Sequence, residues 1–176
     1  MIQFLSKKSV LISSLIFVLF MFAVMFYVNP LIDGNDGSGL LRLQLSFNKE
    51  AGIEIINNWG NSGIENFKKY IFTDYIYAFA YALFLASLVS FLTLKKGREV
   101  SFPCRWVVYL AFAAAILDWV ENTMELSFIN DPVSYSSSLF FLHSIFAIVK
   151  WLAVTIVLAH IVILLAKRNE STELDR

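Results

Sequence analysis

Four long apolar runs, separated by shorter polar segments, dominate the pattern of the chain. They cover residues 9–28, about 70–94, about 106–128 and about 137–166. An α-helix rises about 1.5 Å per residue, so each run is long enough to cross about 30 Å of hydrocarbon. No small-x-small cleavage motif follows the first run, so we expect it to be retained as a helix rather than removed as a signal peptide. The pattern predicts an all-α membrane protein, a bundle of four transmembrane helices.

The segment between the first two runs, about residues 30–69, is more polar and contains shorter patterns. Residues 41–47 alternate between apolar and polar side chains, which predicts a short strand or an extended piece. Asn48 is a favourable helix cap and Gly60 a favourable stop, so a short amphipathic helix is expected between them. Its apolar face carries Ile53, Ile56 and Trp59 and is expected to rest at the membrane interface.

A second helical run follows Gly60 and leads into the second transmembrane helix. We therefore expect residues 30–69 to form a partly helical cap over the external mouth of the bundle, with a loose loop as the alternative. Residues 1–168 then form a single four-helix transmembrane domain. Residues 169–176 are expected to be a disordered charged tail.

Basic residues are distributed unevenly around the four runs. Lys7 and Lys8 precede the first run, Lys95, Lys96, Arg98 and Arg105 surround the link between the second and third, and Lys167 and Arg168 follow the fourth. Because four crossings place all three groups on one side, the positive-inside rule predicts that both termini are cytoplasmic. Short charged loops and few cysteines fit an integral, multi-pass protein of a bacterial inner membrane.

The composition agrees with a membrane protein and excludes several functions. Hydrophobic residues make up 58% of the 176 residues and charged residues only 16%, which is too apolar for an ordinary soluble domain. Acidic and basic residues balance at 14 each, so no nucleic-acid partner is expected. Cys104 is the only cysteine, which excludes an internal disulfide, Cys-x-x-Cys redox chemistry and a cysteine-rich zinc site.

Polar side chains recur at helical spacing in the last three runs. The second run carries Tyr70, Asp74, Tyr77 and Tyr81, the third carries Asp118, Glu121, Asn122 and Glu125, and the fourth carries His143 and Lys150. Residues three and four apart share one face of a helix. Lipid cannot satisfy such a face, so each is predicted to turn toward the other helices.

These polar groups are expected to meet in the outer half of the bundle. From the expected helix ends, Asp118 lies roughly 15 Å deep, Lys150 roughly 20 Å, and Glu121 and His143 roughly 10 Å. The lysine side chain leans toward the start of its helix, which brings its ammonium toward Asp118. We therefore predict a Lys150–Asp118 ion pair and leave Glu121 without a partner. Glu125 is expected to lie near the interface and to have no functional role.

The charges in this region do not balance. The region contains four acidic side chains, Asp74, Asp118, Glu121 and Glu125. Lys150 is the only side chain there that is expected always to carry a positive charge. Bare carboxylates are costly in a low dielectric, so some are expected to be protonated, exposed to water or bound to a cation.

A resident metal or cofactor is not predicted. Asp118, Glu121 and His143 could supply ligands, but no His-x-x-x-His or Glu-x-x-His pair is present. Gly-x-Ser-x-Gly and glycine-rich phosphate loops are also absent from the sequence.

The candidate site residues are Asp118, Glu121, Asn122, Lys150, Asp74, His143, Tyr77, Tyr81 and Trp151, with Trp119 as a further aromatic wall. We expect an external-facing acidic and aromatic pocket that binds a lipid, an amphipathic amine or a proton. One alternative is a small membrane enzyme that acts on a lipid-like substrate, with Glu121 or Asp118 as general acid or base. The other is a structural or regulatory subunit whose charges only fix helix register. Besides the bilayer, the expected partners are a second copy of the chain or a larger membrane complex.

Overall fold

A computed structural model describes residues 1–33, 39–95 and 102–173. The helices of this part of the chain are α1 (Ile2–Leu5), α2 (Lys8–Val28), α3 (Pro30–Asp33), α4 (Gly39–Gln44), α5 (Lys49–Lys95), α6 (Phe102–Asn130) and α7 (Ser137–Glu173). These ranges contain no strand. The prediction of an all-α fold is confirmed.

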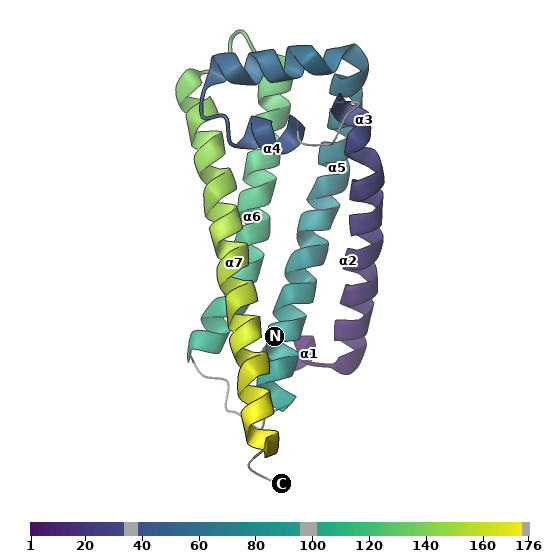
Figure 1. Ribbon diagram of the computed structural model, residues 1–176, viewed down its shortest axis with the longest axis vertical. Coiled ribbons are helices and arrows are strands. Elements are labelled where there is room, and N and C mark those ends of the chain that lie inside the picture. The colour runs from purple at the N-terminus through teal and green to yellow at the C-terminus, as the bar shows by residue number, and fades with distance from the viewer. Residues whose placement is uncertain (34–38, 96–101, 174–176) are drawn as a thin grey trace.

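Four helices are long and apolar enough to cross a membrane, as the sequence predicted. They are α2, α5, α6 and α7, which run side by side as an elongated bundle (Figure 1). Helix α5 lies against α2, α6 and α7, and α7 also packs along α6. Helix α2 packs on α5 but hardly on α7, so the bundle is not closed between α2 and α7.

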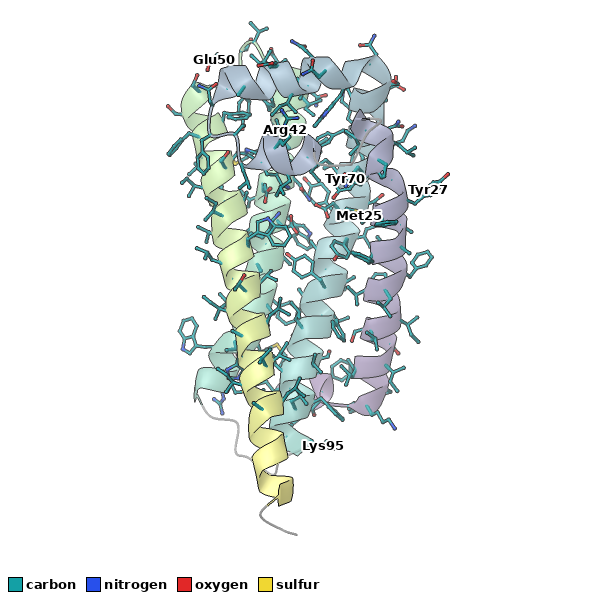
Figure 2. The ribbon with its side chains drawn as sticks, in the orientation of Figure 1. Met25, Tyr27, Arg42, Glu50, Tyr70 and Lys95 are labelled. Carbon is teal, nitrogen blue, oxygen red and sulfur yellow. The ribbon has the colours of Figure 1, made fainter. Side chains whose placement is uncertain are left out.

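Helix α2 is apolar around its whole circumference. Ile16, Phe20 and Phe26 are mostly exposed on it, whereas Met21 and Met25 face α5 and are buried. Figure 2 shows Tyr27 projecting away from the bundle and Met25 lying on the opposite, inner side of the helix. A helix that is apolar on all sides is stable in hydrocarbon or in a protein core, and α2 has little core to face.

The cap over one end of the bundle is helical throughout its described residues. The first part of α5 lies across that end and α4 lies beneath it (Figure 1). The backbone N–H of Ala51 donates to Asn48 Oδ1 at 2.8 Å, which confirms Asn48 as a helix cap. The strand predicted from residue 41 is wrong, because α4 extends to Gln44 and buries Leu43 and Gln44. Alternation over so few residues does not separate a strand from one helical turn.

The cap packs on the bundle through the apolar face that the sequence identified. Ile56 and Trp59 are buried and belong to one core with Phe128 and Phe140 from α6 and α7. A Cβ atom added at Gly52 would lie 2.5 Å from the Phe140 ring, so that helix approaches closely. The face therefore rests on the bundle, and the expectation that it lies on the membrane interface is wrong.

Hydrogen bonds tie the cap to the bundle. Lys49 Nζ donates to the carbonyl of Val133 at 2.7 Å, and the N–H of Phe47 donates to Ser144 Oγ at 3.3 Å. In the turn between α6 and α7, the N–H of Ser134 donates to Asp131 Oδ1, and this bond lowers the pKa of the exposed Asp131 carboxyl. At the other end of the bundle, α7 continues to Glu173, into the segment expected to form a tail.

Helix α5 bends at Gly60, where the cap helix turns into the long helix of the bundle. Gly60 has φ of 63° and ψ of −177°, a conformation essentially restricted to glycine. We expect Gly60→Ala to reduce the free energy of unfolding by about 1–3 kcal/mol. Nothing lies near an added Cβ at this position, so the loss would come from backbone strain and not from a clash. Thermal unfolding in detergent measures it, with exposed Asn57→Ala as control. An unchanged midpoint for Gly60→Ala would contradict the assigned bend.

Candidate functional site

The predicted polar faces of α5, α6 and α7 meet inside the bundle beneath the cap. Lys150 Nζ donates to Asp118 Oδ1 at 2.9 Å, which confirms the predicted pair. The same ammonium lies 2.6 Å from Glu121 Oε2 and forms an ion pair with it, without the geometry of a hydrogen bond. The prediction that Glu121 lacks a partner is therefore wrong. Asp118 and Glu121 lie three residues apart on one helix face, so one long side chain reaches both.

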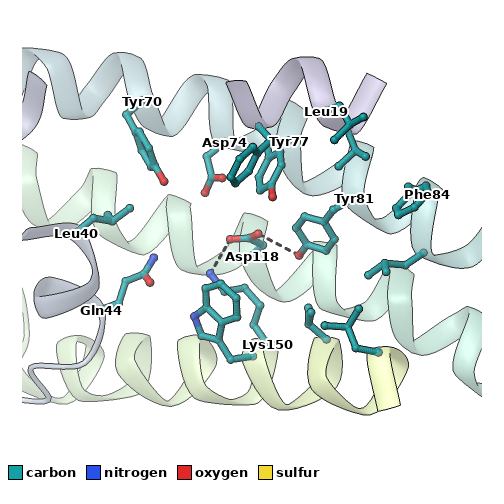
Figure 3. Close-up of a pocket in the computed structure, with 16 residues that line it drawn as sticks. Leu19, Leu40, Gln44, Tyr70, Asp74, Tyr77, Tyr81, Phe84, Asp118 and Lys150 are labelled. Carbon is teal, nitrogen blue, oxygen red and sulfur yellow. Dashed lines mark hydrogen bonds and ion pairs between the residues drawn. The ribbon is translucent and has the colours of Figure 1, made fainter. Parts of the chain in front are cut away.

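Hydrogen bonds also hold the two aspartates that face the middle of the bundle. Tyr81 Oη donates to the second oxygen of Asp118 at 3.1 Å, so both Asp118 oxygens are engaged (Figure 3). Asn122 Nδ2 donates to Asp74 Oδ2 at 3.0 Å. Asp74 has no ion pair within the described ranges of the chain. Asp118 is thus neutralised by Lys150, whereas Asp74 is held only by a neutral amide.

A second polar pair lies closer to the cap. His143 Nε2 is 3.0 Å from Glu125 Oε1, and both residues are almost completely buried. The prediction that Glu125 lies near the interface, which rests on its distance from the helix end, is wrong because Glu125 is 1% exposed. The cap covers that end, and Phe128 and Phe140 seal the space above the pair. The distance of a residue from the end of its helix does not predict its exposure when another segment covers that end.

Several buried polar atoms near these pairs have neither a hydrogen-bond partner nor an ion-pair partner among the described residues. They are Glu121 Oε1, Asn122 Oδ1, Glu125 Oε2 and His143 Nδ1. An unpaired buried polar group costs about 1–3 kcal/mol, so buried groups are nearly always paired. Four such atoms on α6 and α7 mark this as an unusual part of the interior.

A cavity of about 480 Å³ lies beside the aspartates. Its polar wall consists of Gln44, Tyr70, Asp74, Tyr77, Tyr81, Asp118 and Lys150. Its larger, apolar wall consists of Val18, Leu19, Phe22, Leu40, Phe84, Leu85, Trp151, Val154 and Leu158. Figure 3 shows the Tyr70, Asp74 and Tyr77 side chains directed from α5 toward Asp118 and Lys150. A pocket of this size with a few convergent polar groups is typical of small-molecule sites.

The cavity opens sideways, between α2 and α7. Leu19 and Phe22 on α2 and Leu158 on α7 line it and are each about half exposed. Leu40 and Gln44 of α4 close it toward the cap. The opening exists because α2 packs on α5 and hardly touches α7.

The predicted site residues fall into two groups. Asp74, Tyr77, Tyr81, Asp118, Lys150 and Trp151 line the cavity, while Glu121, Asn122 and His143 lie outside its lining. Trp119 is wrong as a cavity wall, because its indole N–H donates to the Tyr75 carbonyl on the outer side of α5. The sequence reasoning missed Gln44 and discounted Glu125. No signal in the sequence identifies Gln44, because the alternation over residues 41–47 predicts an extended segment and not the helix α4.

Comparisons with protein families, curated proteins and solved structures find no match to this chain. The function is therefore inferred from the chemistry of the described residues.

Proposed function

We propose that the protein is an integral membrane protein whose cavity binds an amphipathic amine, such as a long-chain alkylamine or an amine-bearing lipid. The observation that carries the proposal is Asp74. Its carboxyl lines the cavity, is almost completely buried, and has no cationic partner within the described part of the chain. A buried carboxyl is stable when it is protonated or lies beside a positive charge, and a ligand ammonium would supply such a charge.

The surroundings of Asp74 suit an ammonium group. The rings and hydroxyls of Tyr70, Tyr77 and Tyr81 surround the same polar wall, and aromatic faces attract cations. Tyr77 and Tyr81 pack edge to face, with ring centroids 5.6 Å apart, so their orientation is fixed before a ligand binds. Lys150 does not cancel the attraction, because Asp118 and Glu121 both pair with it.

The rest of the cavity suits an apolar chain. Its wall is mostly aliphatic and aromatic, and the opening between α2 and α7 leads to the apolar outer surface of the bundle. An amphiphile would place its ammonium at Asp74 and its chain along Leu19 and Leu158. Acid–base catalysis by Glu121 has less support, because Glu121 does not line the cavity.

The proposed orientation places both termini in the cytoplasm and the cap outside, as in a bacterial inner membrane. The N-terminus, the Glu173 end of α7 and the Lys95 end of α5 lie toward the end of the bundle opposite the cap (Figures 1 and 2). Lys7 and Lys8 also flank the start of α2 and are exposed. These basic residues support the orientation by the positive-inside rule, and the four basic residues of the cap segment are accompanied by five acidic ones.

Dodecylamine, dodecanol and dodecanoate share one chain length and differ in head-group charge. We expect the purified protein to bind dodecylamine more tightly than the other two. Asp74→Asn should weaken dodecylamine binding about 10- to 100-fold, the range for a lost hydrogen bond to a charged group. It should leave dodecanol binding unchanged, because asparagine keeps the size and the oxygen that Asn122 contacts. Isothermal titration in detergent measures all three ligands.

Asp131→Asn is the matched control, because it removes an exposed carboxyl far from the cavity. Its binding constants should equal those of the wild type. Equal loss of dodecylamine and dodecanol in Asp74→Asn would point to damage of the cavity. No preference of the wild type for the amine would exclude the proposed charge recognition.

A further inference from the structure

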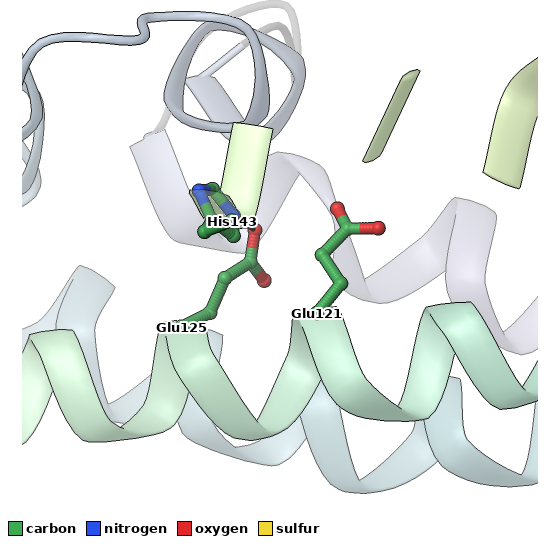
Figure 4. A group of neighbouring side chains, drawn as sticks. All are labelled: Glu121, Glu125 and His143. Atoms are coloured by element: carbon green, nitrogen blue, oxygen red, sulfur yellow. Dashed lines mark hydrogen bonds and ion pairs between the residues drawn. The ribbon is translucent and has the colours of Figure 1, made fainter. Parts of the chain in front are cut away.

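The pair Glu125–His143 and the neighbouring Glu121 form a second cluster, separate from the cavity. Glu121 and Glu125 lie one turn apart on α6, and His143 faces them from α7 (Figure 4). Each side chain offers a ligand atom, and these atoms all lie within 4.8 Å of one another. None of the three residues lines the cavity.

The spacing of these atoms suits a metal ion. Bonds of about 2.0–2.2 Å hold the ligand atoms of a tetrahedral zinc ion roughly 3.3–3.6 Å apart. The ligand atoms of this cluster lie within 4.8 Å of one another, so side-chain movements of roughly 1 Å would bring them to bonding distance of an ion. In Figure 4 both carboxyl groups extend from α6 on the side of the helix where His143 lies.

Unpartnered atoms of the same side chains point to a missing positive charge. Glu121 Oε1 and Glu125 Oε2 have no hydrogen-bond partner among the described residues, and all three side chains of the cluster are at most 2% exposed. A cluster that served only to fix helix register would leave fewer of its atoms unpaired. The Glu125–His143 hydrogen bond uses only one atom of each residue.

The balance of buried charge supports a divalent ion. Among the described residues, four buried carboxyls belong to this region, with Lys150 as the buried ammonium and His143 available as a neutral ligand. If every carboxyl is ionised, three negative charges remain in excess. One divalent ion reduces that excess to one, and an ammonium bound at Asp74 removes the last.

The geometry points to a divalent transition-metal site formed by Glu121, Glu125 and His143. Two carboxylates and one imidazole are ligands of Zn²⁺ and Mn²⁺, and three protein ligands leave a coordination position open. The sequence did not predict this site, because its ligands form no metal-binding motif on a single helix.

Zn²⁺, Mn²⁺ and Co²⁺ are the probes for this site. After treatment with a chelator, the purified full-length protein should bind one equivalent of Zn²⁺ or Mn²⁺ in isothermal titration. Co²⁺ should give the visible absorption of a low-symmetry site. Loss of a side chain that only orients a metal ligand costs about 10- to 100-fold in affinity, so Glu125→Gln should cost at least 100-fold. Asp131→Asn is the control, because it removes an exposed carboxyl outside the proposed ligand set.

His143→Cys keeps the test decisive if Glu125→Gln fails to fold. A thiolate at this position should bind Co²⁺ and add a sulfur-to-metal charge-transfer band in the near ultraviolet, which a purely structural histidine would not produce. A wild-type protein that binds none of the three ions would overturn the inference, as would unchanged affinity in Glu125→Gln. Because Asp74→Asn tests amine binding and Glu125→Gln tests metal binding, either proposal can fail while the other stands.

Discussion

Replacing Lys150 with methionine is expected to destabilise the protein by about 3–5 kcal/mol, the usual cost of removing one partner of a buried ion pair. Methionine nearly preserves the length and packing of the lysine stem. The substitution leaves Asp118 and Glu121 buried without the ammonium that lies 2.9 Å and 2.6 Å from their oxygens. Unfolding in mixtures of denaturing and mild detergent, followed by circular dichroism, measures the change.

Neutralising the acids in the same chain separates charge from packing. We expect Lys150→Met combined with Asp118→Asn and Glu121→Gln to recover most of the lost stability, because uncharged side chains of similar volume replace a buried ion pair at little cost. Lys69→Met removes an exposed ammonium and should change stability by less than about 0.5 kcal/mol. If Lys150→Met is as stable as the wild type, the two carboxyls do not depend on Lys150.

Filling the cavity should abolish most ligand binding without touching its charged wall. Val154 is half-buried and lines the cavity on α7, so Val154→Trp places an indole in the space proposed for the apolar chain. We expect dodecylamine and dodecanol both to bind at least about tenfold more weakly, a loss of about 1.4 kcal/mol or more. Loss of both ligands together distinguishes this variant from Asp74→Asn, which acts on the amine alone.

Val162→Trp is the control for added bulk on the same helix. Val162 lies about two turns beyond Val154 and is 63% exposed on the outer surface. Its substitution should leave both binding constants unchanged. Full dodecylamine binding by Val154→Trp would show that the ligand occupies another site.

The sequence predicted the long helices and the cap helix because those features depend on local signals. Apolar length identifies a span, and Asn48 and Gly60 mark the two ends of the cap helix through a side-chain hydrogen bond and a glycine-only conformation. The Lys150–Asp118 pair was also predictable, since helical spacing and depth place both groups at one level.

The remaining contacts depend on how separate segments pack. Glu125 is buried because the cap crosses the end of α6, and no property of α6 alone reports that. Glu121 has a partner because the Lys150 ammonium reaches both Glu121 and Asp118. The depths of the residues along their helices predict only the Lys150–Asp118 pair. Trp119 faces outward because it follows Asp118 directly and so lies about 100° around α6 from it, and its indole N–H bonds to the Tyr75 carbonyl of α5. Gln44 lines the cavity from the short helix α4, which packs against α5 and α7.

The opening between α2 and α7 determines which concentration governs binding. A ligand that enters there comes from the bilayer and need not pass through the cap. Its occupancy would follow its mole fraction among the lipids, not its concentration in water. A strongly partitioning amine would then saturate the protein from a dilute solution even with modest intrinsic affinity. Adding empty vesicles would lower the occupancy at constant total ligand, because the added lipid dilutes the ligand within the membrane.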